Sequence, residues 1–394
     1  MTAAAGRRLR VLVIAPSRHP IRQPHAGGLE AAVWDRVRAL RAAGHDAVLV
    51  ASHGSDFLDR TPEALRMPAV VWGATRSSDA VYPPGYLDGV ARVLDELMDR
   101  LAADPGAFDL IDNHSLHPIP IARSAEHGIP MRTTLHTPPL PELVEAAAAA
   151  GPGHAFVSVS AHTASEWRRT GVASTVEPNV VDAEAWPLGR GGARLVWFGR
   201  IVPEKGPHLA IEAAEALGRR LVLAGRVGDV EYYERAIAPR LGRAVRHVGP
   251  LRRRRLARLV GASGCALVTP CWDEPFGLVV AEALTTGTPV VAFDRGGIRE
   301  VVGDLPGAAL VPPGDVGALA EAALRLGSPG AAERERIRER ALERFSSAGR
   351  IARLVAQAGV APAPTRAAAP PVPASLAPRL LRIVDPGDGA EAGA

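Results

Sequence analysis

The pattern that decides the fold lies at residues 194–225, RLVWFGRIVPEKGPHLAIEAAEALGRRLVLAG. A short apolar run is followed by a loop, by an amphipathic segment at 206–218 and by a second apolar run. Apolar runs of this length that alternate with helical patterns are typical of βαβ units with buried parallel strands. The stretch therefore predicts an α/β fold.

The same alternation extends in both directions along the chain. After this stretch we expect strands at AVRHVG, CALVTP, TPVVAF and 308–311, and helices near 230–239, 252–261, 277–286, 314–326 and 331–344. Before it we expect helices near 29–43 and 86–102, and strands at LRVLVIA, DAVLVAS, AVVWG, FDLIDNH, MRTTLH, HAFVSVS and STVEPNV. The segment DAEAWPLGRGGAR at 182–194 breaks the rhythm and is typical of a linker.

This organisation predicts two Rossmann-like domains that face each other across a cleft, where ligands of open α/β sheets usually bind. We expect an N-terminal domain over 1–185 and a C-terminal domain over 194–344. Residues 361–394 contain seven prolines and many alanines, so we expect a disordered tail there.

The composition excludes several classes of protein. With 394 residues, 47% hydrophobic and 22% charged, the chain is an ordinary globular one of about two domains. Cys265 and Cys271 provide neither a disulfide framework nor zinc spacing. No apolar run approaches a spanning helix, and the N-terminus is more typical of a first strand than of a signal peptide. We therefore expect a cytoplasmic enzyme.

The charge distribution contains one unusual position. The formal net charge is +4, which is compatible with anionic small ligands, a membrane surface or nucleic acid. The run Arg252-Arg253-Arg254-Arg255 lacks interleaved aromatic residues, so we expect no nucleic-acid partner. Lys205 is the only lysine among 46 basic residues. A site that needs a compact ammonium would not accept arginine at this position.

Two loops carry candidate binding residues. Arg200 and Lys205 follow one strand, where a guanidinium and an ammonium suit phosphate oxygens. Glu274 precedes a helix, and Glu282 lies two turns along it within the apolar run LVVAEAL. A helix start also provides backbone N–H groups for an anion. A solvated loop and a helix-capping acid are the alternative interpretations of these residues.

Together these motifs resemble the retaining glycosyltransferases of family 4 (GT4), which have the GT-B fold. The resemblance rests on the ordered set GGLE (27–30), GRIVPEKG (199–206), EPFGLVVAE (274–282) and GTPVVAFDRGGIREVV (287–302). It implies an enzyme that moves a hexose or amino-hexose from a nucleotide-diphosphate sugar to a hydroxyl acceptor. It also implies a helix at 345–360 that crosses back to the first domain.

The resemblance assigns a role to each matching residue. It places the diphosphate on Arg200 and Lys205, the transferred sugar on Glu274 and the ribose on Glu282. Further donor contacts are implied for Gly27, Gly28 and the backbones of Phe276 and Gly277, and His114 matches a histidine beside the transferred sugar. We regard Arg200, Lys205, His114 and Glu274 as the catalytic set, and His25 and His136 as candidate acceptor contacts.

The mechanism follows from the absence of an acidic metal-binding triplet. No D-x-D sequence occurs in the chain, so we expect Arg200 and Lys205 to stabilise the leaving phosphate without a metal or another cofactor. UDP-GlcNAc, UDP-glucose, GDP-mannose and a deoxysugar nucleotide all remain candidate donors. A nucleotide-sugar epimerase of the same fold and a noncatalytic nucleotide-sugar-binding partner are the alternative functions.

Overall fold

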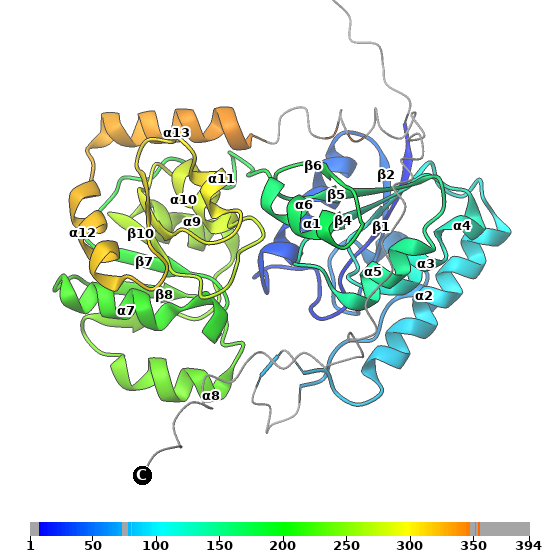
Figure 1. Cartoon of the computed structure of the whole chain (residues 1–394), viewed down its shortest axis with the longest axis horizontal. Helices are drawn as coiled ribbons and strands as arrows, with labels where there is room; N and C mark the ends of the chain where they lie inside the picture. Colours follow the sequence, from blue (N-terminus) through cyan, green and yellow to red (C-terminus); the bar gives the residue numbers. More distant parts are fainter. Residues whose placement is uncertain (1–7, 73–77, 80, 347–350, 352–353, 355–394) are drawn as a thin grey trace, which may run out of the picture.

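The computed structural model describes residues 8–72, 78–79, 81–346, 351 and 354. Two six-stranded sheets lie side by side, each flanked by helices (Figure 1). Every pairing between neighbouring strands in both sheets is parallel. The predicted α/β fold with two parallel sheets is therefore confirmed.

The first sheet has the strand order β2-β1-β3-β4-β5-β6. Its strands are β1 (Arg10–Ile14), β2 (Asp46–Val50), β3 (Leu110–Asn113), β4 (Met131–Leu135), β5 (His154–Ser158) and β6 (Thr175–Val176). The helices of this half are α1 (Gly28–Ala42), α2 (Tyr86–Ala103), α3 (Pro118–Ala122), α4 (Ser124–His127), α5 (Pro141–Ala148) and α6 (Ala161–Arg169), with short 3-10 turns at Leu58–Arg60 and Glu63–Leu65.

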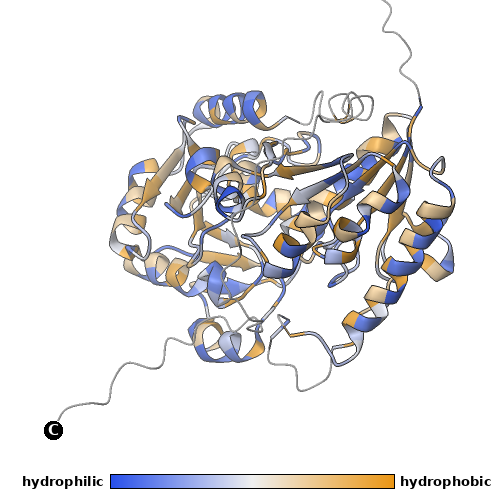
Figure 2. Ribbon diagram, turned by 45° about the vertical axis from the view of Figure 1, so that its right-hand side comes forward, coloured by the Kyte–Doolittle hydropathy of each residue, from blue (hydrophilic) through white to orange (hydrophobic). Residues whose placement is uncertain are grey.

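Side chains of β1 alternate between the two faces of this sheet. Val11 and Val13 pack with α1, whereas Leu12 and Ile14 pack with α2. This is the period of two expected for a strand, and burial on both faces explains why the run is apolar throughout. In Figure 2 the strands of both domains are mostly hydrophobic, whereas the helices carry a hydrophilic face.

The second sheet has the order β12-β11-β10-β7-β8-β9. Its strands are β7 (Leu195–Phe198), β8 (Leu221–Ala224), β9 (Val245–His247), β10 (Cys265–Val268), β11 (Val290–Phe293) and β12 (Ala308–Val311). The helices are α7 (Pro207–Ala216), α8 (Val230–Tyr232), α9 (Arg253–Gly261), α10 (Leu278–Thr285), α11 (Ile298–Val302), α12 (Val316–Leu326) and α13 (Ala331–Phe345). A 3-10 turn at Pro203–Lys205 carries the lysine.

Three expected elements differ from the structure. The strand predicted at AVVWG is wrong, because residues 69–72 have no regular structure. The predicted strand STVEPNV is only Thr175–Val176, since Pro178 cannot donate to a ladder. The helix predicted at 230–239 breaks into α8, a π turn at Tyr233–Ile237 and a 3-10 turn at Ala238–Arg240, which contains Pro239.

The segment expected to cross back to the first domain falls mostly outside the described residues. Its two described residues after position 346 are Ile351 and Leu354, and both pack with the hydrophobic cluster beneath α1. Residues of β7 and α13, by contrast, belong to the clusters of the second sheet. The expected tail at 361–394 lies outside the described residues, and the domain boundaries stay predictions.

Candidate functional site

Helices α1 and α10, which belong to different domains, begin close together. A Cβ on Gly28 would lie 3.7 Å from Leu278 Cδ2. Gly277 precedes α10 with a φ of 87°, and a Cβ there would lie 2.9 Å from Ile298 Cγ1, so this position needs glycine. Neither helix has a side-chain cap. Their first backbone N–H groups and their dipoles therefore favour an anion at this junction.

Lys205 and Glu274 meet at the carboxyl edge of the second sheet. Lys205 Nζ lies 2.5 Å from Glu274 Oε2, which also accepts a hydrogen bond from Trp272 Nε1 at 2.9 Å. The ammonium lies 4.9 Å from the centre of the Trp272 ring. The structure thus brings together two residues that are 69 positions apart and that the sequence assigned to one site.

Arg200 is held by two carboxylates. Its Nη1 donates to Asp79 Oδ1 at 3.1 Å and its Nη2 donates to Glu204 Oε1 at 2.8 Å. The Glu204 carbonyl accepts from the Cys271 N–H at 2.8 Å, which joins the loop of Arg200 to the loop of Glu274. The cation therefore has a fixed position beside the Lys205–Glu274 pair.

Asp79 reaches this loop from the first domain and was not predicted. It is 1% exposed, and its backbone N–H donates to the Gly228 carbonyl at 2.7 Å. Arg226 also donates to its carboxylate, and His19 Nε2 lies 3.6 Å away. Burial opposes ionisation, but His19 and the two arginines lower the pKa of Asp79 to about 2. Asp79 is therefore a buried carboxylate that occupies an anion position beside Arg200.

His114 and His136 form a second cluster, at the ends of β3 and β4. His114 Nδ1 lies 2.8 Å from His136 Nε2, and His114 Nε2 lies 3.3 Å from Asp112 Oδ1. Burial lowers the pKa of His114, although Asp112 opposes this shift. Asp112 lies 3.3 Å from both Arg36 Nε and Arg132 Nε. Burial disfavours its charge, but these cations and His114 hold the pKa of Asp112 well below its usual range.

This network fixes the orientation of both imidazoles. A neutral His114 whose Nε2–H faces the ionised Asp112 leaves Nδ1 as the acceptor for His136 Nε2–H. The two histidines line a cavity of about 70 Å³ beneath α1. Its other lining residues include Asp35, Arg36, Thr134, Asn179, Asp182 and Ile351.

Glu282 lies half-buried on α10 without a cation partner among the residues that the structure describes. The pKa of Glu282 is raised to about 8, mainly by burial. The nearby Arg253 opposes this rise, and the nearby Asp35 adds to it. Arg253 is itself engaged across the domains, since its Nη1 and Nη2 donate to the Asp35 carboxylate at 2.5 and 2.8 Å. The other three arginines of that basic run are exposed.

The remaining predicted residues lie around these groups. His25 packs edge-on against Trp34 with ring centres 5.6 Å apart, and burial, with Arg253 nearby, lowers the pKa of His25 to about 3. The Phe276 side chain is buried in the second-domain core, which leaves its backbone at the start of α10. Gly27 caps α1 in an extended conformation. The structure thus brings these predicted residues together as two pairs, His114 with His136 and Lys205 with Glu274.

Glu300 makes a further contact between the domains. Its two carboxylate oxygens accept from the backbone N–H groups of Ala161 and His162 at 2.7 and 2.6 Å, so a residue of α11 caps helix α6 of the first sheet. Beside it, Thr163 Oγ1 donates to the Pro275 carbonyl at 3.2 Å. The loop that leads to α10 is therefore tied to the first domain.

Two kinds of feature are absent from the described residues. Over the ranges given above, the chain has no group of three or more histidine, cysteine, aspartate or glutamate side chains placed to hold a metal ion. None of the helices in these ranges combines the length and the apolar character that crossing a membrane requires.

Comparisons with known proteins point to one family. The model of glycosyl transferases group 1 matches residues 183–344, and the model of glycosyltransferase family 4 matches residues 26–185. Glycogen synthase of Mycobacterium tuberculosis is 38% identical over 173 residues, a match that spans 41% of each chain. D-inositol 3-phosphate glycosyltransferase of Frankia alni is 29% identical over 341 residues, which cover 72% of this chain and 83% of the relative.

A solved structure has the same architecture. The crystal structure of HepE from Anabaena in complex with UDP-glucose aligns with a TM-score of 0.66 at 19% identity, covering 89% of this chain and 99% of that one. This likeness establishes the fold.

Proposed function

Since this chain belongs to the GT4-type glycosyltransferases of GT-B fold, we propose that it transfers a hexose or amino-hexose from a nucleotide-diphosphate sugar to a hydroxyl acceptor. We propose further that the transfer retains the anomeric configuration and needs no metal. The observation that carries the proposal is the contact of Lys205 with Glu274 beside Arg200, at the edge where α1 and α10 begin.

The donor diphosphate is proposed to bind between these cations and the start of α10. Arg200 suits two phosphate oxygens, Lys205 provides a point charge, and the backbone N–H groups after Gly277 add neutral donors. Glu274 then lies within reach of hydroxyls on the transferred sugar, and Glu282 farther along α10 is assigned to the ribose. The diphosphate would take the place beside Arg200 that Asp79 now occupies.

The chemical step requires stabilisation of a leaving phosphate. The bond between the anomeric carbon and the phosphate oxygen breaks, and its electron pair stays on the phosphate. The acceptor oxygen bonds to the same face of that carbon, and its proton passes to the leaving phosphate oxygen. Because negative charge grows on the phosphate in the transition state, cations already held in place lower the barrier.

The buried histidine pair is proposed to contact the transferred sugar. Asp112 orients His114, and His114 in turn orients His136. Each imidazole therefore has a fixed donor nitrogen and a fixed acceptor nitrogen. His25 is retained as a candidate acceptor contact, because it lies on the loop before α1.

One experiment separates this function from its alternatives. The purified chain is screened by thermal shift against UDP-glucose, UDP-GlcNAc and GDP-mannose, and the stabilising donor is incubated with excess EDTA, with and without hydroxyl acceptors. A ligand at a hundred times its Kd adds about 2.7 kcal/mol of stability. Transfer only in the presence of an acceptor supports the proposal. Conversion of the donor alone indicates an epimerase, and binding without turnover across the acceptor panel indicates a noncatalytic partner.

A further inference from the structure

A second charged region lies at the opposite edge of the second sheet. A hollow of about 1040 Å³ opens where β7, β8 and β9 begin. Arg194 immediately precedes β7, whereas Arg200 follows its end, so the strand separates this hollow from the Lys205–Glu274 pair. Five arginines line it: Arg194, Arg219, Arg220, Arg243 and Arg246. We call it the arginine hollow.

These arginines have no counterions in the part of the chain that the structure describes. None of the five forms an ion pair there, and the lining contains no aspartate or glutamate. By contrast, Arg240, which follows the π turn of the same domain, pairs with Glu212 and Glu215. The missing carboxylates are therefore a property of the hollow rather than of the whole domain.

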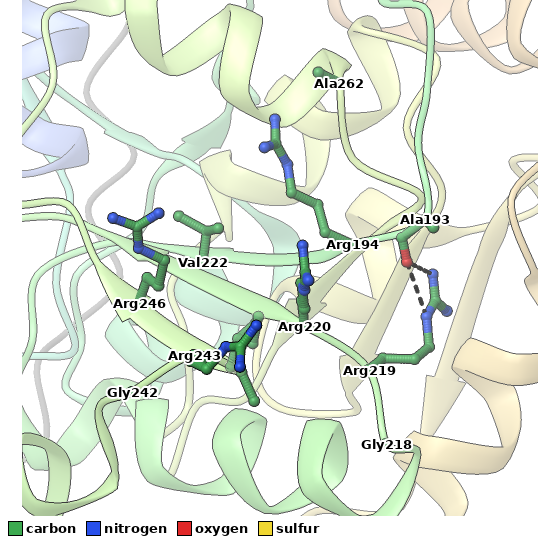
Figure 3. Close-up of a pocket in the computed structure, with 12 residues that line it drawn as sticks. Ala193, Arg194, Gly218, Arg219, Arg220, Val222, Gly242, Arg243, Arg246 and Ala262 are labelled. Atoms are coloured by element: carbon green, nitrogen blue, oxygen red, sulfur yellow. Dashed lines mark hydrogen bonds between the residues drawn. The ribbon is translucent and has the colours of Figure 1, made fainter.

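The side chains surround one space. In Figure 3, Arg194, Arg220 and Arg243 extend around the hollow, while Arg219 turns aside and donates to the Ala193 carbonyl. The Nε of Arg194 is buried and has no hydrogen-bond partner among the described residues. A buried donor without an acceptor costs free energy, so a group that accepts a hydrogen bond there would be stabilising.

Like charges that share a concavity repel each other and raise the local concentration of anions. Guanidinium groups are planar forks that match phosphoryl oxygens, and they are more weakly hydrated than ammonium groups. Arg220 and Arg243 come from different loops, so a ligand that engages both must present acceptor groups in two directions.

We propose that the arginine hollow binds a discrete ligand that carries two or more phosphoryl groups. Two features of the lining support this choice. It contains no aromatic side chain for base stacking, which single-stranded nucleic-acid sites use. The exposed large hydrophobic residues of the described chain lie elsewhere, whereas a membrane-binding face usually inserts such side chains. This inference does not depend on sugar transfer.

Inorganic tripolyphosphate is the probe, and calorimetric titration of the full chain is the measurement. Lys205→Ala serves as the background, because it weakens binding of the probe at the proposed donor site. Adding Arg220→Glu and Arg243→Glu should weaken the remaining binding about tenfold or more, as for loss of one charge-assisted hydrogen bond. Both arginines are exposed, so circular dichroism should show an unchanged fold.

The matched control carries two equivalent charge reversals outside the hollow. Arg235→Glu and Arg325→Glu alter arginines with 73% and 68% exposed side chains in the same domain. The control should bind tripolyphosphate like the Lys205→Ala background. Equal weakening in both double-reversal proteins would indicate a general charge effect and overturn the proposal, as would absence of binding to the background protein.

A vesicle arm distinguishes a free ligand from a lipid surface. Cosedimentation with phosphatidylcholine vesicles containing phosphatidylglycerol should be the same for the wild-type chain and the Arg220→Glu, Arg243→Glu variant. If this variant loses vesicle binding but keeps tripolyphosphate binding, the hollow is a membrane contact and the proposal is wrong.

Discussion

Basic side chains cluster at both edges of the second sheet, but the two clusters differ in whether carboxylates pair with them. At the carboxyl edge, Lys205 is paired with Glu274, and Arg200 with Asp79 and Glu204. At the amino edge, five arginines line the arginine hollow, and no carboxylate is among the described residues that line it. One sheet thus carries a paired and an unpaired basic cluster.

This difference is the one expected between the proposed transfer site and the proposed phosphoryl-binding hollow. A cation that is held by carboxylates keeps its position before a ligand arrives, as stabilisation of a transition state requires. An arginine without a counterion contributes attraction but no fixed geometry. Loss of charge should therefore affect turnover at the carboxyl edge and affinity alone at the amino edge.

Replacement of Lys205 is the most severe test of this comparison. Lys205→Ala should lower kcat/KM by about two to three orders of magnitude, as for loss of one strong electrostatic stabiliser. Lys205→Arg should recover only part of the loss, because a planar fork cannot occupy the same point. Steady-state kinetics with the donor identified by thermal shift, in excess EDTA, measures both. Near-normal kcat/KM for Lys205→Ala, with an unchanged unfolding temperature, would contradict the proposed mechanism.

Removing the partner of a buried arginine tests what pairing contributes to stability. Asp35→Asn leaves Arg253, which is 7% exposed, without its counterion, so the free energy of unfolding should fall by about 3 kcal/mol. Urea unfolding checks this value. The matched control is Asp59→Asn, whose exposed carboxylate pairs with Arg41 and should contribute less than about 1 kcal/mol. Equal losses in the two variants would show that burial does not strengthen the pair.

Glu282 is the inverse case, a carboxyl group that forms no ion pair with any residue that the structure describes. Burial raises the pKa of Glu282 to about 8, above its usual value, so the folded chain binds this proton more tightly than the unfolded chain does. Protonation of Glu282 therefore stabilises the folded chain fully at acidic pH, and this stabilisation is lost as pH rises toward 8. Over this range the free energy of unfolding falls by up to about 1.4 kcal/mol per pH unit. Glu282→Gln should remove that slope in urea unfolding measured across this range. A variant with the wild-type pH dependence would assign the titration to another group.

The smallest effect is expected at the amino edge. Arg220→Glu with Arg243→Glu should leave kcat and the donor KM within about twofold of the wild-type chain, because β7 separates these residues from Lys205. The kinetic assay used for Lys205→Ala provides the measurement. A large fall in kcat would couple the two edges and contradict the division between chemistry and binding.

The local sequence pattern predicted most of the fold, and it predicted the loop of Arg200 and Lys205 and the loop of Glu274. Apolar runs and helix starts placed the strands, and the carboxyl edge of a parallel sheet brought Lys205 and Glu274 together. The run AVVWG was misleading, because its apolar residues form no ladder with a neighbouring strand. The carboxylates of Asp79 and Asp35 carry no local signal, since their partners lie 121 and 218 positions away.

The arginine hollow had a signal that could have been used. Arg194 and Arg220 each stand directly before a strand of the second sheet, and Arg243 stands two residues before another. Because the amino ends of parallel strands share one edge, basic residues at these positions must gather there. The absence of counterions could not be predicted in the same way, because it depends on where every acidic side chain of the domain folds.

The Glu300 contact can be followed in solution by hydrogen exchange at two backbone amides. The amide hydrogens of Ala161 and His162 are held by a carboxylate of the other domain, rather than by their own helix. Their exchange with deuterium therefore requires the contact with Glu300 to break, whereas the deeper amides of α6 exchange only when the helix itself unwinds. The ratio of these rates would measure how often the Glu300 contact between the domains breaks in solution, and a ligand that bridges the domains would slow the first pair selectively.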